Sequence, residues 1–297
     1  MHAEVQGIDQ LRWSDRLRRR ARRALRSGPP FDVGVAIERL PPSSYLEQAR
    51  RWALVVHPEW LTPATTAGIA GVDLLLCKTH EAEQVLTPLG RPLAYTGWTT
   101  HDRQDPRIPR AVPPFALHVG GSSGQKGTND LIAVWGRHPE WPRLEVVSWV
   151  VGEAERELAK AAPNITLHDT FLSPDGALKR LMNAATWHLC PSEAEGYGHT
   201  IVEAMSCGRV VLTTDAAPMN ELVRPDRGIL VRPGPGRPQH YGTRYRVDHE
   251  ALEAAITAML AGGEAHTRAL CSAARQWYLE ADRQAQRRIM DALRRLA

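Results

Sequence analysis

Residues 186–208 read TWHLCPSEAEGYGHTIVEAMSCG. The first five residues form an apolar run typical of a buried strand, and from about Gly198 the apolar residues take helical spacing. Two carboxylates, Glu195 and Glu203, and two glycines, Gly196 and Gly198, lie at the connection. The stretch therefore predicts a strand, a turn of flexible backbone and the start of a helix, which is the repeating unit of an α/β fold.

The same alternation of strand and helix runs along most of the chain. Near-continuous apolar strands separated by helices indicate a parallel sheet with both faces covered. A proline-rich stretch at 105–114 interrupts the series, which then starts again. The predicted strand regions are 31–37, 52–57, 72–77, 92–97, 115–121, 144–152, 164–169, 186–192, 209–215 and 228–233.

Two such series predict two Rossmann-like domains that face one another across a cleft. Residues 1–112 form the first domain, which is reduced in size, and residues 113–262 form the second. The segment from Asp248 onward has helical character, with Gly262 and Gly263 as a break. We expect the helical segment 263–297 to pack back on the first domain.

Length and composition agree with a protein of this kind. A chain of 297 residues is long enough for two cores, and its apolar share of 43 % and charged share of 24 % are ordinary for a globular protein. No apolar run reaches the roughly 18 residues of a membrane span, and arginines stand where a signal peptide has its apolar core. We therefore expect a cytoplasmic protein. Four scattered cysteines predict buried side chains rather than a zinc site, and no bound metal is expected.

A glycine-rich turn follows the strand at 115–121. The sequence LHVGGSSGQKGTNDLIAVW, residues 117–135, places Lys126 just before a helix. Small residues let the backbone approach a phosphate, the helix N-terminus supplies N–H groups, and the lysine supplies a charge, so the turn predicts a diphosphate site. It is not a Walker motif, because no Ser or Thr follows Lys126 directly. A simple reversal of the chain would also use such glycines.

The connection at Glu195 has two interpretations. Thr200 and Glu203 have the spacing of a capping box, which would explain Glu203 but neither Glu195 nor the glycines. Alternatively, the glycines Gly196 and Gly198 bring helix N–H groups to a ligand, and the two carboxylates accept hydrogen bonds from hydroxyls on either side of it. A ligand with phosphates between two hydroxyl-bearing rings is a nucleotide sugar.

Residues 191–223, PSEAEGYGHTIVEAMSCGRVVLTTDAAPMNELV, resemble the donor-binding signature of the retaining family four glycosyltransferases, the group 1 type with the GT-B fold. Residues 119–127, VGGSSGQKG, resemble the phosphate-binding turn of the same family. The resemblance covers residues 115–262. It implies transfer of a sugar from a nucleoside-diphosphate sugar to an acceptor hydroxyl, with retained anomeric configuration and no cofactor or metal.

The resemblance also implies roles for single residues. Glu195 binds hydroxyls of the sugar, Glu203 binds the ribose, and Lys126 neutralises the leaving diphosphate. Glu221 matches a family glutamate of structural type. The family commonly has an arginine where Gly121 stands, so a serine of the turn or an arginine of the first domain would have to compensate. The further donor-binding residues implied are Gly120, Gly121, Ser122, Ser123, Gly196, Tyr197, Gly198, His199 and Thr200.

The acceptor side is predicted from residues that follow strands of the first domain. These side chains would face the cleft, since the carboxyl ends of parallel strands meet at one edge of a sheet. Arg244, from a basic segment of the second domain, joins this group. The candidates are His57, Glu59 and His101, together with Lys78, Thr79, Thr99 and Thr100.

The acceptor itself has two interpretations. The interpretation that we favour is DNA that carries a hydroxylated base. Its backbone would be neutralised by the basic segments 12–26 and 232–246, and its bases would stack on Tyr241 and Tyr245 of the second segment. Alternatively, segment 12–26 has an apolar side that would contact a membrane bearing a lipid-linked or saccharide acceptor. A non-catalytic protein that binds nucleotide sugar or nucleic acid would also use this fold.

Overall fold

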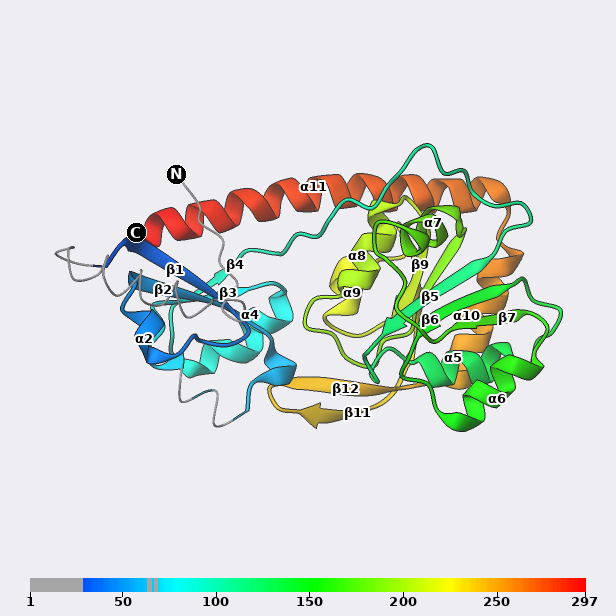
Figure 1. Cartoon of the computed structure of the whole chain (residues 1–297), viewed down its shortest axis with the longest axis horizontal. Helices are drawn as coiled ribbons and strands as arrows, with labels where there is room; N and C mark the ends of the chain where they lie inside the picture. The colour runs from blue at the N-terminus through cyan, green and yellow to red at the C-terminus, as the bar shows by residue number, and fades with distance from the viewer. Residues whose placement is uncertain (1–28, 63–65, 67–68) are drawn as a thin grey trace, which may run out of the picture.

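The structure, a computed structural model, describes residues 29–62, 66 and 69–297, so the basic segment 12–26 lies outside the described residues. Figure 1 shows two α/β units side by side, joined by an extended segment and by the C-terminal helix. Every predicted strand region contains a strand, and the sheets that these strands form are parallel. The predicted α/β class with two Rossmann-like units is confirmed.

The first unit has a sheet of four strands in the order β1-β2-β3-β4. Its apolar core contains Leu54, Leu75 and Leu86, each buried to 2 % exposure or less. The four-stranded sheet is smaller than its six-stranded partner, as the reduced first domain predicts. The elements are β1 (Phe31–Ile37), α2 (Ser43–Leu46), β2 (Ala49–Val56), η2 (Pro58–Trp60), β3 (Leu74–Cys77), α4 (His80–Leu86), η3 (Thr87–Leu89) and β4 (Leu93–Tyr95).

The second unit has a sheet of six strands in the order β10-β9-β8-β5-β6-β7. The chain starts in the middle of the sheet, builds β5, β6 and β7 toward one edge, then returns to build β8, β9 and β10 toward the other. The loops after β5 and β8 diverge at this switch point, which is where ligands bind in open α/β sheets. The elements are β5 (Ala116–Gly121), α5 (Thr128–Trp135), β6 (Leu144–Ser148), α6 (Glu153–Ala161), β7 (Ile165–His168), α7 (Ala177–Ala184), β8 (Trp187–Cys190), α8 (His199–Ser206), β9 (Val210–Thr214), α9 (Met219–Leu222) and β10 (Ile229–Val231).

The basic segment 232–246 is an antiparallel hairpin, formed by β11 (Pro233–Gln239) and β12 (Gly242–Val247), which was not among the predicted strand regions. Its prolines and glycines are depleted in strands, which concealed the hairpin in the sequence. Tyr241 packs against the core of the first unit, whereas Tyr245 packs against a cluster of the second. The hairpin therefore ties the two units together.

Two helices end the chain, α10 (His249–Ala261) and α11 (Glu264–Leu296), with the predicted break between them. At 33 residues, α11 is about 50 Å long and reaches from the second unit to the first (Figure 1). Ala274 and Tyr278 belong to the core beside α8. The far end packs its apolar side on the first sheet, where Ala292, Leu293 and Leu296 contact Ala53, Val55 and Leu76.

Two expectations from composition are tested by the described residues. Cys77, Cys190 and Cys207 are buried free thiols, as predicted, whereas the free thiol of Cys271 is only partly buried. Within the described ranges, none of the helices is long and apolar enough to cross a bilayer. The cellular location stays a prediction.

The docking of α11 gives a first test. Replacement of Leu293 and Leu296 by alanine removes apolar contacts with the first sheet, and we expect a loss of about 1 to 3 kcal/mol per site in the free energy of unfolding. Leu279→Ala is the matched control, since this side chain lies on the same helix with 42 % exposure, and its effect should stay within about 0.5 kcal/mol. Urea titration measures both. Equal effects would contradict the docking.

Candidate functional site

The loops that follow β5 and β8 are packed against one another at the switch point. Glu193 N donates to Gln125 O at 2.8 Å. Gly127, the N-cap of α5, has φ +67°, and a Cβ there would lie 2.2 Å from Pro191 O. Only glycine fits this backbone conformation and this close approach. The contact fixes the position of the residue before Gly127, which is Lys126.

Lys126 and Glu195, predicted from separate loops, form an ion pair. Lys126 Nζ lies 2.5 Å from Glu195 Oε1, and Ser192 Oγ donates to the same oxygen at 2.7 Å. The two charged side chains are only 15 % and 8 % exposed. The pair is shielded from water, so an anionic ligand that binds Lys126 would compete directly with the Glu195 carboxylate.

Gly120 has a packing role that sequence analysis missed. His118 Nδ1 donates to Leu189 O at 2.7 Å, and Thr128 Oγ1 lies 2.8 Å from His118 Nε2. Burial lowers the pKa of His118 to about 4, so the ring is neutral at pH 7 and Nε2 accepts from the threonine. A Cβ on Gly120 would lie 2.5 Å from Thr128 Oγ1. The glycine makes room for this hydrogen bond between β5 and α5.

Gly121, Ser122 and Ser123, the next three residues of the turn, lie in other environments than Gly120. Gly121 has φ +58°, a conformation that glycine adopts without strain. Ser122 is exposed, and Ser123 Oγ accepts from Gln125 N at 3.3 Å. These residues form the outer part of the turn in front of Lys126.

The predicted capping box at α8 is wrong. The helix begins at His199, its N-cap is Gly198 with φ +105°, and no side chain caps it. Thr200 is thus the second residue of the helix, two positions past the N-cap, and cannot cap it. Glu203 instead accepts from Arg103 Nε at 3.0 Å. The N–H groups of the first turn are therefore left to a ligand or to water.

Arg103 is a neighbour of the site that sequence analysis missed. It lies in the extended segment between the units, where no periodic pattern singles out one residue. Its pair with Glu203 is partly buried, with both side chains 18 % exposed. Asn183 holds the backbone at this point, since its Nδ2 donates to Arg103 O at 2.8 Å. The arginine is thereby fixed against the carboxylate.

The side chain of Tyr197 belongs to the protein core. It is 4 % exposed, packs in the cluster beside α8 and donates its hydroxyl to Trp98 O at 2.9 Å. Only its backbone faces the predicted donor site. The tyrosine of the Gly-Tyr-Gly stretch thus anchors the loop to the segment that joins the two units.

Residues of the first unit meet the Glu195 loop from across the cleft. A Cβ on Gly196 would lie 2.2 Å from His57 Nδ1 and 2.3 Å from Glu59 Oε1. His57 in turn contacts the ammonium group of Lys78, which lies 5.2 Å from the centroid of the Trp98 ring. Glu59 and Lys78 are 5 % and 3 % exposed. The structure thus brings together three of the predicted acceptor-side candidates.

Two other candidates lie apart from that group. Arg244 is paired with Glu193 and also donates to Gly124 O at 3.4 Å, so it braces the two loops of the switch point. His101 is exposed and follows Thr100, whose carbonyl accepts from Tyr278 of α11 at 3.0 Å. Both were predicted from sequence position alone.

His199 lies near charged side chains of both units. Its pKa is lowered to about 4 by partial removal from solvent and by nearby Lys78, Lys126 and His57. The imidazole is neutral at pH 7 and offers one donor and one acceptor. The charges of Lys78 and Lys126 also make the potential at the start of α8 more positive.

Glu221 joins the two units at the edge of this site. Its carboxylate accepts from His80 N and Glu81 N, both at 2.8 Å, at the first turn of α4. This contact agrees with the structural type expected for Glu221. Burial, together with Glu221 and Glu59, raises the pKa of Glu81 to about 7.

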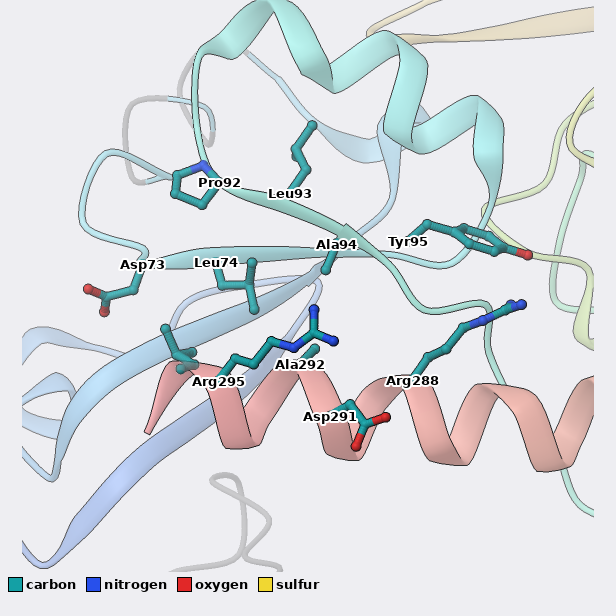
Figure 2. Close-up of a pocket in the computed structure, with 11 residues that line it drawn as sticks. Asp73, Leu74, Pro92, Leu93, Ala94, Tyr95, Arg288, Asp291, Ala292 and Arg295 are labelled. Carbon is teal, nitrogen blue, oxygen red and sulfur yellow. The ribbon is translucent and has the colours of Figure 1, made fainter.

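A partly open pocket of about 370 Å³ lies on the first unit (Figure 2). It is lined by residues of β3, β4 and the end of α11, with Arg288 and Arg295 on the helix side. Asp73 and Asp291 also line it, so its charges are mixed. None of the predicted site residues lines this pocket. Within the described ranges, no cluster of three or more His, Cys, Asp or Glu side chains could hold a metal, and metal independence stays a prediction.

This fold and site define a class. The two α/β units have parallel sheets and face one another, which is the GT-B type of glycosyltransferase fold. A helix N-terminus and an ion pair lie at the switch point of the second unit. Residues 113–261 match the family described as Glycosyl transferases group 1. The chain belongs to this family.

Individual relatives match a smaller part. The chain is 29 % identical over 156 residues to an alpha-maltose-1-phosphate synthase of Mycolicibacterium smegmatis, a match that covers 48 % of this chain and 36 % of the relative. It is 32 % identical over 124 residues to a GDP-mannose:cellobiosyl-diphosphopolyprenol alpha-mannosyltransferase of Xanthomonas oryzae, covering 39 % of this chain and 32 % of that relative. The matches thus span about a third of each of these relatives.

Solved structures share the fold at low identity. A glycosyltransferase from Rickettsia africae superposes with a TM-score of 0.69 at 14 % identity, covering 100 % of this chain and 85 % of that one. The sucrose-phosphate synthase of Thermosynechococcus elongatus gives a TM-score of 0.68 at 18 % identity, covering 95 % and 77 %. The pneumococcal O-GlcNAc transferase GtfA, solved with UDP and GlcNAc, gives 0.66 at 16 % identity, covering 88 % and 56 %.

The close approach at Gly196 gives a second test. Gly196→Ala places a methyl group against the buried side chains of His57 and Glu59, so we expect the two units to separate at the cleft. Small-angle scattering should show a larger radius of gyration and calorimetry a lower melting temperature. Gly263→Ala is the control, because no atom lies within 4 Å of its added Cβ. An unchanged radius for both variants would refute the tight contact.

Proposed function

We propose that the chain transfers a sugar from a nucleoside-diphosphate sugar to an acceptor hydroxyl, with retention of the anomeric configuration. The observation that carries this proposal is the shielded ion pair of Lys126 and Glu195 beside the uncapped start of α8. A diphosphate supplies the anion that the lysine and the helix N–H groups attract, and sugar hydroxyls supply donors for the released carboxylate. One ligand thus satisfies both partners of the pair.

The same groups would stabilise the transition state. Departure of the nucleoside diphosphate breaks the bond between the anomeric carbon and the phosphate oxygen, and the electron pair stays on that oxygen. Lys126 and the first N–H groups of α8 lie where this negative charge grows, and each fixed donor is worth roughly 3 kcal/mol. Glu195 holds the sugar while the acceptor oxygen bonds to the face that the diphosphate leaves, and the proton of the acceptor hydroxyl passes to the released phosphate oxygen.

Glu203 is proposed to bind the ribose. Arg103 Nε and a terminal guanidinium nitrogen both contact Oε1 of this carboxylate at 3.0 Å, so the arginine fixes its orientation. The other oxygen is then directed to ribose hydroxyls. Arg103 acts through Glu203 and is a positioning residue.

For the acceptor, we propose a saccharide or lipid-linked saccharide rather than DNA. The names of both curated relatives refer to saccharide chemistry, and one of them names a polyprenol-linked substrate. In the hairpin, Tyr241 and Tyr245 pack within the protein, and Arg244 pairs with Glu193, so these groups are occupied. Arg237 and Arg246 are exposed and leave a smaller basic surface for nucleic acid.

Hydrolysis of the donor without acceptor tests the enzymatic proposal. Purified protein should slowly release nucleoside diphosphate from one member of a panel of UDP-, GDP- and ADP-sugars, and Lys126→Ala should lower this rate by about 100-fold because one fixed donor is lost. Lys160→Ala is the control, since this lysine is 63 % exposed and pairs with Glu157 on α6. Binding of the nucleotide sugar without turnover in any assay would favour a non-catalytic binding protein.

The acceptor is tested with the donor thus identified. Transfer to a polyprenyl-diphosphate-linked saccharide or to a free sugar phosphate is expected, whereas hydroxymethylated duplex DNA should accept no sugar and show no gel shift at low salt. Salt-sensitive binding to DNA that is lost in an Arg237→Ala, Arg246→Ala variant, together with transfer to its bases, would overturn this choice.

A further inference from the structure

We propose that Lys78, a residue of the first unit, binds the diphosphate of the donor as a second cation opposite Lys126. The inference rests on the proposed function and adds a binding residue to it.

The charges around the switch point call for such a group. A nucleoside-diphosphate sugar carries two negative charges on its phosphates. Lys126 is already paired with Glu195, and Arg244 is paired with Glu193, so these four side chains sum to zero. The helix terminus of α8 adds a partial charge of only about one half. About one and a half positive charges are then still missing, and one further cation would supply most of them.

Lys78 lies on the cleft side of the first sheet. It directly follows Cys77, the last residue of β3, and the next residue, Thr79, caps α4 by accepting from Ala82 N at 3.1 Å. The backbone is therefore held between a strand end and a capped helix. The carboxyl ends of these parallel strands face the second unit, where the ligand is expected.

Contacts connect Lys78 to the Glu195 loop. Its ammonium group touches His57 Nε2, and the opposite ring nitrogen of His57 would lie 2.2 Å from a Cβ on Gly196. A single imidazole ring thus separates the ammonium group from the residue that follows Glu195. Lys78 and Lys126 also both lower the pKa of His199, so both charges act on the start of α8.

Among the described residues, no carboxylate lies within ion-pair distance of the Lys78 ammonium group, although Glu38 and Glu59 are close enough to affect its pKa. Lys78 is 3 % exposed, and lysines are seldom buried to this degree unless they are paired. Its contacts are the His57 ring and the face of Trp98. Burial lowers its pKa to about 8, and Glu38 and Glu59 partly oppose this shift. A diphosphate would supply the missing counter-charge.

Binding of UDP or GDP compared with the matching nucleoside tests the proposal. Lys78→Met keeps the apolar stem and removes the charge, so the Kd of the diphosphate should rise by at least about 10-fold, as expected for loss of a charged hydrogen bond. The Kd of uridine or guanosine should change less than about 2-fold, because these ligands lack phosphates. Lys78→Arg should restore most of the diphosphate affinity.

The pH dependence of diphosphate binding is a second test, and it does not require the Lys78→Met variant. Lys78 is protonated well below pH 8 and neutral well above it, so diphosphate affinity should fall between pH 7 and 9 in the native protein. In Lys78→Arg the fall should disappear, because arginine stays charged. The groups that face Lys78 from neighbouring elements are Glu38, His57, Glu59, His199 and Lys126. All are unchanged in this variant.

The outcomes separate the two proposals. If the native protein binds none of the nucleoside diphosphates, the proposed function itself fails. If the native protein binds one and Lys78→Met binds it equally well, only the role of Lys78 is refuted. Equal losses for diphosphate and nucleoside would also refute it, since they would show a general disturbance of the cleft.

Discussion

The close packing of the loops after β5 and β8 is the constraint on which the site depends. These strands are neighbours in the sheet but are built in separate passes of the chain, so their loops meet only after the whole second unit has formed. Gly127 allows the approach, because any Cβ there would overlap Pro191 O. The approach brings Lys126 to Glu195, and neither loop could hold its charged side chain in a shielded position alone.

A second requirement is that the units remain close. Three contacts hold them together. Helix α11 packs on the cores of both units. The Glu221 carboxylate of the second unit caps α4 of the first, and Tyr241 of the hairpin packs against the core of the first unit. These contacts place His57 and Glu59 against Gly196, with Lys78 behind the His57 ring, so side chains more than a hundred positions apart meet here.

Much of this arrangement was predictable from sequence, and the reason is periodicity. Apolar runs of strand length specified the strands, the glycines marked both loops, and Lys126 and Glu195 were recognised beside them. The hairpin was missed because proline and glycine conceal short strands. Arg103 was missed because its partner lies 100 positions away and no local pattern refers to it. The capping box predicted at Thr200 is wrong because a spacing of three positions between Thr200 and Glu203 does not by itself fix where a helix begins.

The path of α11 has a mechanical consequence. The chain crosses between the units twice at the same side, first through the extended segment after β4 and later through α11, and the two crossings are bonded together where Tyr278 donates to Thr100 O and Arg275 pairs with Asp102 (Figure 1). Because both crossings lie together, the opposite side of the molecule is joined by side-chain contacts rather than by the chain itself. A separation of the units there would have to withdraw Tyr241 from the first core and Glu221 from α4, and would move His57 and Glu59 away from Gly196.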